Sequence, residues 1–410
     1  MSVPVLRFVE FSENWKSIHL GDLTTTLTSG SRDWAQHYSI TGSKFIRMTN
    51  LSRDGIQLKL DDLKFVNVKS DSADGKRTSL VHGDILISIT AELGKIGWIP
   101  PNFGEAFINQ HTALVRLEER VADSRCVSHL LSTTKLNNEI NKNNDSGAKA
   151  GLNLPTIKSL KITLPKKEEQ TKIANFLTAV DEKIQHLTQK TDLLAQYKKG
   201  VMQQIFNQEL RFKDDGGVEF PEWEEKQLGE VFNDFKGSGL SKDKIGVMGK
   251  SKCILYGHLF TKYSEIITNI YSRTDFEEGL LSKVNDILMP SSTTTSGIDL
   301  ANASSLKEEG VLLGGDIIVL RFKESGNSDF FAYYLTHGVD KEIAEVTQGI
   351  TIIHLYFKEL KKLLVKVPSV AEQTKIANFL TAIDDKITQT KTQLAAVKQY
   401  KQGLLQQMFV

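Results

Sequence analysis

The sequence predicts a mixed α+β (α/β) protein in which two domains with curved sheets are joined by two long helices that pair antiparallel within the chain. Three observations predict this fold class: a perfect internal repeat, a heptad pattern of apolar residues inside each copy of it, and short strand-like runs between the copies. The 410 residues also exceed one ordinary domain core. We expect a first domain at 1–164, a first helix at 165–212, a second domain at 213–367 and a second helix at 368–410.

The perfect repeat marks the chain as a tandem duplication. The segment EQTKIANFLTA occurs at 169–179 and again at 372–382, and self-similarity of this kind is the signature of a duplicated architecture. A weaker echo begins each copy, because residues 6–8 (LRF) match residues 210–212. The second copy ends where another Leu-Arg-Phe would follow, so we expect a pseudo-twofold arrangement with the two termini close together.

Each copy of the repeat carries the pattern of a coiled-coil helix. Apolar side chains recur about every seven residues, with one polar exception at Thr390, and this spacing places them on one seam. Tyr197 and Tyr400 are expected to widen the apolar stripe. A single helix of this kind would ordinarily pair with a second chain, but two tethered copies favour antiparallel pairing within one chain. The seam residues are Ile173, Val180, Leu187, Leu194, Val201, Ile376, Ile383, Val397 and Leu404.

The stretches between the repeated parts, 23–150 and 231–350, share little sequence and are predicted to fold into the domains. They contain short strand-like runs such as GDILISI and GDIIVLRF, separated by polar loops. Helical patterns are few, at about 124–141 and 328–346. Two different inserts on similar scaffolds suit a molecule that recognises two different targets with domains of the same architecture.

Polar loops in both inserts supply candidate contacts to nucleic acid. Their side chains can hydrogen-bond base edges and phosphates, although any one such loop is more often an ordinary solvated loop. The candidates in the first insert are Lys44, Arg47, Thr49, Asn50, Lys76, Arg77, Thr78, Asn109, Gln110 and His111, and those in the second are Lys262, Ser291, Ser292, Thr293, Thr294 and Thr295.

Composition limits the other classes of protein to consider. The net charge of +1 gives no bulk attraction to nucleic acid or membrane, although a neutral total can hide a basic face. The two cysteines, Cys126 and Cys253, form no disulfide or metal-binding pattern, and no apolar run is long enough to span a membrane. The reducing cytoplasm is therefore the expected compartment.

No catalytic or metal-binding motif is recognised. Residues 249–251 (GKS) resemble the end of a phosphate-binding loop, but Lys244 stands where its first glycine should be. The nine histidines show no ligand spacing, and no glycine-rich turn suggests a bound nucleotide or S-adenosylmethionine. We expect no catalytic residue, no metal and no cofactor on this chain.

The scaffold motifs resemble those of the type I restriction-modification specificity subunits. They are the runs 210–213 (LRFK) and 220–223 (FPEW), Leu228-Gly229, and Pro165 or Pro368 leading into the repeated Glu-Gln-x-Lys-Ile-Ala. The resemblance covers the whole chain. It implies that each domain reads one half of a split double-stranded DNA target and that the helices set the spacing between the halves.

The resemblance also implies partners and places the chemistry on them. Two modification subunits would grip the helices, bind S-adenosylmethionine and methylate adenine, and restriction subunits would use ATP and Mg²⁺ to cleave. A structural coiled-coil adaptor with two protein-binding domains is the alternative from another class. An isolated methylase or nuclease is a third alternative, which the missing motifs disfavour.

Overall fold

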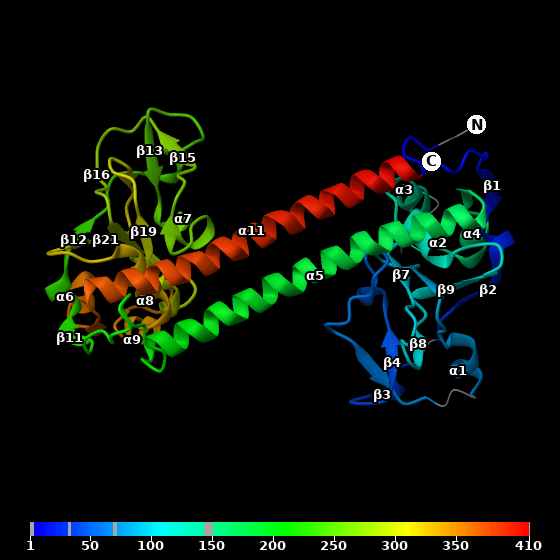
Figure 1. Ribbon diagram of the computed structural model, residues 1–410, viewed down its shortest axis with the longest axis horizontal. Helices are drawn as coiled ribbons and strands as arrows, with labels where there is room; N and C mark the ends of the chain where they lie inside the picture. The colour runs from blue at the N-terminus through cyan, green and yellow to red at the C-terminus, as the bar shows by residue number, and fades with distance from the viewer. Residues whose placement is uncertain (1–3, 32–33, 69–71, 143–150, 410) are drawn as a thin grey trace. The chain divides into compact units, whose positions relative to one another are not determined.

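The computed structural model describes residues 4–31, 34–68, 72–142 and 151–409. The chain divides into two compact units: unit 1 is Met1–Gln189 with Lys391–Val410, and unit 2 is Lys190–Thr390. Each unit contains one mixed α+β domain and one end of each long helix. These helices are α5 (Lys167–Phe206) and α11 (Val370–Met408), drawn in green and in orange to red in Figure 1.

The described part of unit 1 contains two four-stranded sheets and one two-stranded sheet. In spatial order the first sheet is β2 (Thr24–Ser29), β9 (Thr112–Leu117), β6 (Ile85–Ser88) and β7 (Ile96–Trp98), and the second is β3 (Tyr38–Ser39), β5 (Lys64–Val66), β4 (Ser43–Ile46) and β8 (Ala106–Ile108). Strand β1 (Lys16–His19) pairs with β10 (Lys161–Leu164). The shorter helices are α1 (Ala73–Thr78), α2 (Ser124–Leu131), α3 (Thr134–Lys142) and α4 (Leu154–Lys158).

The described part of unit 2 repeats this plan with a longer central sheet. That sheet runs β12 (Phe232–Lys236), β21 (Ile317–Phe322), β17 (Asp286–Pro290), β19 (Ser304–Leu306) and β14 (Ile266–Ile267), beside a second sheet of β15 (Ser272–Thr274), β13 (Ser251–Ile254), β20 (Leu312–Leu313) and β16 (Leu280–Leu281). Two further pairs are β11 (Glu224–Gln227) with β23 (Leu364–Val367), and β18 (Ser292–Thr293) with β22 (Ile353–His354). Its shorter helices are α6 (Leu228–Val231), α7 (Tyr256–Thr261), α8 (Ser328–His337), α9 (Asp340–Glu345) and α10 (Phe357–Leu360).

The central strands are apolar on both faces because each face packs against a different hydrophobic core. In β6, Ile85 and Ile87 share a core with α2, whereas Leu86 belongs to the core formed with the second sheet. In β17, Ile287 and Leu288 divide in the same way. The alternation follows from the two-residue period of a strand, and it explains why these runs show no polar face in the sequence.

The two predicted helical stretches are confirmed, each as a pair of short helices. The first is interrupted between α2 and α3, where the hydroxyls of Ser132 and Thr133 donate back to the carbonyls of His129 and Leu130. The second is interrupted at Gly338, between α8 and α9.

The two long helices run antiparallel in each unit, as predicted. In unit 1 the beginning of α5 and the end of α11 share a core through Ile173 and Leu404. In unit 2 the end of α5 and the beginning of α11 share a core through Val201 and Ile376. All nine predicted seam residues are buried or half-buried, and the polar exception Thr390 is buried as well.

Two details of the helices and termini add to this description. Tyr197 and Tyr400 are 53% and 56% exposed, so the expectation that they widen the apolar stripe is wrong. The termini do meet inside unit 1, because the amide of Leu6 donates to the carbonyl of Gln407 at 2.9 Å. No helix among the described residues is long and apolar enough to cross a membrane.

Candidate nucleic-acid interface

The repeated Glu-Gln pair anchors the domain of unit 1 to the first turn of α5. Glu169 accepts hydrogen bonds from Arg7 Nε at 2.7 Å and from Trp15 Nε1 at 3.3 Å. The side-chain oxygen of Gln170 accepts from the amide of Asp123 at 2.9 Å. The pair therefore connects the N-terminal segment, the helix and the start of α2.

Unit 2 uses the same residues for the same purpose. Glu372 accepts from Arg211 Nη2 at 3.2 Å and from Trp223 Nε1 at 3.1 Å, and Gln373 accepts from the amide of Asn327 at 2.9 Å. The two repeats therefore share this Glu-Gln pair because, in each unit, it fixes the domain to the first turn of a long helix. These residues hold the domains in place.

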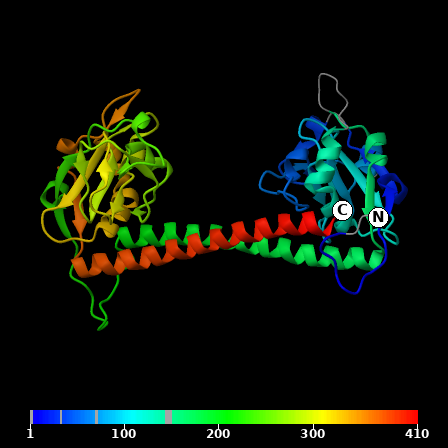
Figure 2. The same cartoon turned by 90° about the horizontal axis from the view of Figure 1, so that it is seen from above.

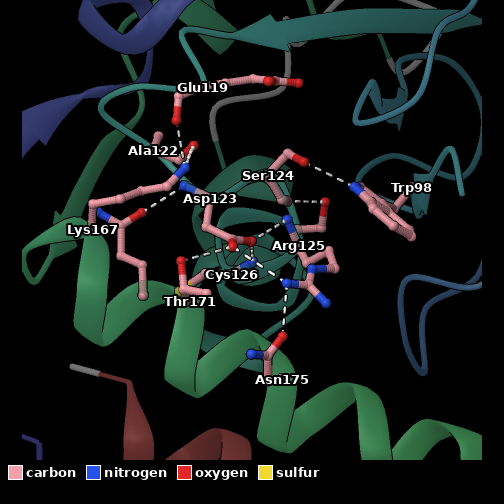
Figure 3. Close-up of polar contacts among 12 residues, drawn as sticks. Trp98, Glu119, Ala122, Asp123, Ser124, Arg125, Cys126, Lys167, Thr171 and Asn175 are labelled. Atoms are coloured by element: carbon pink, nitrogen blue, oxygen red, sulfur yellow. Dashed lines mark hydrogen bonds and ion pairs between the residues drawn. The ribbon is translucent and has the colours of Figure 1, made fainter. Parts of the chain in front are cut away.

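Figure 3 shows how the start of α2 is fixed to α5 in unit 1. Asp123 caps α2 by accepting from the amides of Arg125 and Cys126, at 3.0 and 3.2 Å, and it also accepts from the Thr171 hydroxyl at 3.2 Å. The guanidinium of Arg125 donates to Asn175 Oδ1 at 2.8 Å. A carboxylate at a helix N-terminus satisfies amides that have no partner within the helix, and here it ties the domain to the long helix as well.

Each domain contains an ion pair between a buried aspartate and a partly exposed arginine, and the two pairs occupy corresponding positions. Arg116 Nε lies 2.7 Å from Asp84 Oδ1, and Arg321 Nε lies 2.7 Å from Asp286 Oδ1. Both carboxylates are fully buried. Hydrogen bonding to the carboxylate raises the pKa of each guanidinium. Counting along the strands from this pair, Thr90 corresponds to Ser292 and His111 to Asp316.

In unit 1 the ends of β2 and β6, the loop before β9 and helix α1 enclose an open hollow of about 650 Å³. His111 Nδ1 lies 2.8 Å from Thr90 Oγ1, and His111 Nε2 lies 3.1 Å from Gln110 Nε2. The guanidinium of Arg77 donates to Ser31 Oγ. The lining residues are Ser29, Gly30, Ser31, Arg77, Thr90, Gln110 and His111.

Close backbone approach shapes this hollow. A Cβ on Gly30 would lie 2.2 Å from the carbonyl carbon of Asn109, so only glycine fits there. Asn109 Oδ1 accepts from the amide of His111 at 3.2 Å and from the hydroxyl of Thr112 at 3.3 Å. Asn109 therefore shapes the turn, and Gln110 and His111 line the hollow.

Three sequence-predicted residues, Arg77, Gln110 and His111, are thus brought together. Sequence reasoning missed Thr90 and Ser31, which join them. Thr90 could have been found by extending the match of residues 84–86 with 286–288 into the following loops.

The remaining candidates of unit 1 lie elsewhere, and two are interior. Asn50 is buried, accepts from the amide of Arg47 at 2.9 Å and donates to the carbonyl of Lys59 at 2.7 Å, and Thr78 is also buried. Neither belongs to an exposed contact surface, which corrects the expectation for these two side chains. The reason for Asn50 is local, since its amide closes a turn of the backbone.

Charged candidates of unit 1 are divided between paired and exposed positions. Arg47 pairs with Asp62 at 2.7 Å. Lys44 donates to the carbonyl of Phe103 and lies 4.7 Å from the centre of its ring. Thr49 and Lys76 are exposed.

In unit 2 the corresponding place has different chemistry. A Cβ on Gly237 would lie 2.0 Å from the carbonyl oxygen of Gly314, which repeats the glycine contact of unit 1. Here Asp316 stands at the position of His111, and its carbonyl accepts from the amide of Ser291 at 2.8 Å. Position 315, which corresponds to Gln110, is a glycine.

The predicted loop of unit 2 is partly a strand. Ser292 and Thr293 form β18, pair with β22 and are largely buried, whereas Thr294 and Thr295 are exposed. Lys262 follows α7 and donates to Ser272 Oγ of β15 at 3.3 Å, in the second sheet of the unit. The described residues contain no group of His, Cys, Asp or Glu that could hold a metal ion.

Comparison with known proteins gives a consistent result. Residues 12–196 and 221–399 match the family model described as the type I restriction modification DNA specificity domain. The type I restriction enzyme MjaVIII specificity subunit of Methanocaldococcus jannaschii is 23% identical over 421 residues, covering 96% of this chain and 91% of that protein.

Two solved structures share the fold. The crystal structure of the type I restriction-modification S subunit from M. genitalium has a TM-score of 0.61 at 17% identity, covering 100% of this chain and 99% of that one. A chain from a structure on the complex assembly and conformational transition of the type I R-M system has a TM-score of 0.55 at 16% identity, covering 97% and 98%.

Proposed function

The chain belongs to the type I restriction-modification DNA specificity family, and from this premise we propose that each of its two recognition domains binds one half of a bipartite double-stranded DNA target. A specificity subunit selects the sequence. The helices then set the spacing between the two halves.

One observation carries the proposal of two different half-sites. His111, which contacts Thr90 in one domain, corresponds along the strands to Asp316 in the other, whose carbonyl accepts from the amide of Ser291. A carboxylate accepts hydrogen bonds, for example from the cytosine amino group, whereas glutamine and arginine side chains match adenine and guanine. Equal scaffolds with unequal side chains at this position would read unequal sequences.

We place the chemistry on partner subunits. Two modification subunits would bind S-adenosylmethionine and methylate adenine, and restriction subunits would use ATP and Mg²⁺ for cleavage. This chain is proposed to bind no cofactor of its own and to act in the cytoplasm.

A repeated and largely exposed face of the long helices supports the docking of two copies of one partner. Tyr197, Gly200 and Gln204 are spaced to lie on one face of α5, and Tyr400, Gly403 and Gln407 repeat them on α11. Glycine inside a helix costs about 1 kcal/mol relative to alanine. A Cβ at either glycine would meet no atom of the described residues within 4 Å, so packing within that part of the chain does not explain them.

The test is selection of bound duplexes from a random library by the full chain assembled with a modification subunit. His111→Ala should relax one half of the selected sequence and Asp316→Asn the other, and the exposed Lys161→Ala on β10 should change neither. A change of both halves by one substitution would contradict the one-domain, one-half-site proposal. Binding without sequence selection would favour the structural adaptor instead.

A further inference from the structure

An almost fully exposed isoleucine lies in unit 2 beside the predicted contact loop. Ile350 is 98% exposed and lies between α9 and β22. Figure 2 shows the orange strand of this region on the side of unit 2 away from the start of α11. An aliphatic side chain so completely in water gains nothing from the fold itself.

The tip that carries Ile350 is closed by its own backbone. Gln348 and His354 exchange amide-to-carbonyl hydrogen bonds of 2.9 and 2.7 Å. Gly349 has a φ of +122°, and a Cβ there would lie 2.1 Å from the carbonyl oxygen of Ile352. The turn therefore depends on glycine, and it holds Ile350 in a defined position.

The tip is attached to the loop that contains the nucleic-acid candidates. His354 pairs with Ser292, and Ile353 pairs with Thr293, through β22 and β18. The amide of Leu355 also donates to the carbonyl of Ser291 at 2.9 Å. Thr294 follows β18 and Ile350 precedes β22, so both lie at the same end of this antiparallel pair. A duplex that meets Thr294 would therefore come close to Ile350.

The surroundings of Ile350 fit DNA better than a protein partner. Protein-binding surfaces are contiguous apolar patches. Ile350 instead stands between Gly349 and Thr351 with the exposed Gln348 nearby, and the next apolar side chain, Ile352, is only half-exposed. Proteins that deform DNA insert single apolar side chains, isoleucine among them, between base steps while polar neighbours bind the backbone and base edges. A tip that is closed by backbone hydrogen bonds, with Ile350 as its most exposed apolar side chain, has this form.

We propose that Ile350 is an apolar wedge that inserts between two base steps of the half-site bound by the second recognition domain. The inference rests on the proposed function, because that function brings DNA to this loop. Ile350 would then favour sequences whose base-pair step at this position is easily unstacked. This selection would act in addition to hydrogen bonds to base edges.

The test uses the full chain assembled with modification subunits and the duplex that this complex selects. 2-Aminopurine is placed in turn at each position of the half-site that responds to Asp316→Asn. The wild-type complex should raise the fluorescence at one step. I350S should abolish this rise and weaken binding on the order of tenfold, whereas I350V should preserve both.

Two controls separate the wedge from other effects. The slope of affinity against salt concentration should be the same for I350S and the wild type, because no phosphate contact is removed. I352S, at the half-exposed neighbour, should leave the fluorescence rise in place. Circular dichroism and thermal unfolding check that the variants are folded.

The outcomes distinguish this inference from the function on which it rests. If I350S binds its target as the wild type does, or if binding weakens without any unstacking signal in the wild type, the wedge is overturned while the proposed function stands. A wild-type complex that selects no sequence overturns both.

Discussion

The carboxylate of Glu265 and the imidazole of His337 lie 2.5 Å apart inside unit 2, measured from Oε1 to Nε2. Lys198 of α5 contacts the same carboxylate at 3.2 Å and also pairs with Asp384 of α11 at 2.8 Å. Burial opposes the charge on Glu265, but the hydrogen bond from His337 and the charge of Lys198 together lower its pKa to about 2.

This cluster predicts a pH-dependent contribution to the stability of unit 2. Because the folded pKa of Glu265 lies below its ordinary value of 4.5, its contribution is present above pH 4.5 and is lost as the pH falls toward 2. Glu265→Gln should lower the free energy of unfolding near neutral pH by on the order of 2 to 3 kcal/mol. It should also flatten the decline between pH 4.5 and 2.

Urea unfolding at a series of pH values measures this difference. The exposed Glu345→Gln serves as the control and should follow the wild type. Equal declines for wild type and Glu265→Gln in the acidic range would argue against the assignment.

Removing the partly exposed Arg116 from the fully buried Asp84 should destabilise unit 1. Arg116→Met leaves a fully buried carboxylate without its cation, and breaking such a pair costs about 3 to 5 kcal/mol. Arg321→Met should have the same effect on unit 2, and the exposed Arg120→Met should have little. Chemical denaturation is the measurement, and a loss below about 1 kcal/mol in Arg116→Met would be inconsistent with a structural role for the pair.

Replacing the exposed Gly200 or the half-buried Gly403 of the long helices should raise stability but weaken partner binding. Gly200→Ala and Gly403→Ala should each stabilise the chain by about 0.5 to 1 kcal/mol, because alanine is the better helix former and no atom in the described parts of the chain lies within 4 Å of the new methyl group. Binding of a modification subunit should weaken if its backbone approaches these positions closely. Thermal unfolding and sedimentation test the two effects, with Lys183→Ala as the control, and unaltered assembly would show that the partner uses another face.

Helix length should determine the DNA spacer. Inserting seven residues after Lys190 and seven after Gln393 preserves the heptad seam and adds roughly 10 Å, or about three base pairs. Because three base pairs also rotate the duplex by roughly 100°, the result should be either a longer spacer or lost binding by a protein still folded by circular dichroism. An active insertion variant with the original spacer would refute the role of the helices.

The helices and the duplication could be predicted because their signals are local. The heptad pattern extends over the whole of each helix, and it correctly predicts that residues such as Ile173 and Leu404 are buried. The position where the first helix ends was predicted less well. It stops at Phe206, before the residue Gln208 that adopts a φ of +60°, whereas the predicted segment extended to residue 212.

The candidate interface could be predicted only in part, because its residues meet through long-range strand pairing. Thr90 reaches His111 since β6 and β9 are adjacent, and the sequence does not contain that register directly. The sequence also cannot distinguish a polar side chain that hydrogen-bonds the nearby backbone, as Asn50 does, from one that faces a ligand.

Because Leu6 and Gln407 are hydrogen-bonded, the same fold could be encoded with its chain ends at a different place in the sequence. The end of α11 lies beside Leu6, in the place where the end of α5 leads to residues 207–212, so a short linker could join the end of α11 to the chain near Leu6. New ends could then be opened in the exposed turn at Gly216 and Gly217. Such a circular permutant would carry its recognition domains in the reverse order along the gene while keeping the same contacts within each unit.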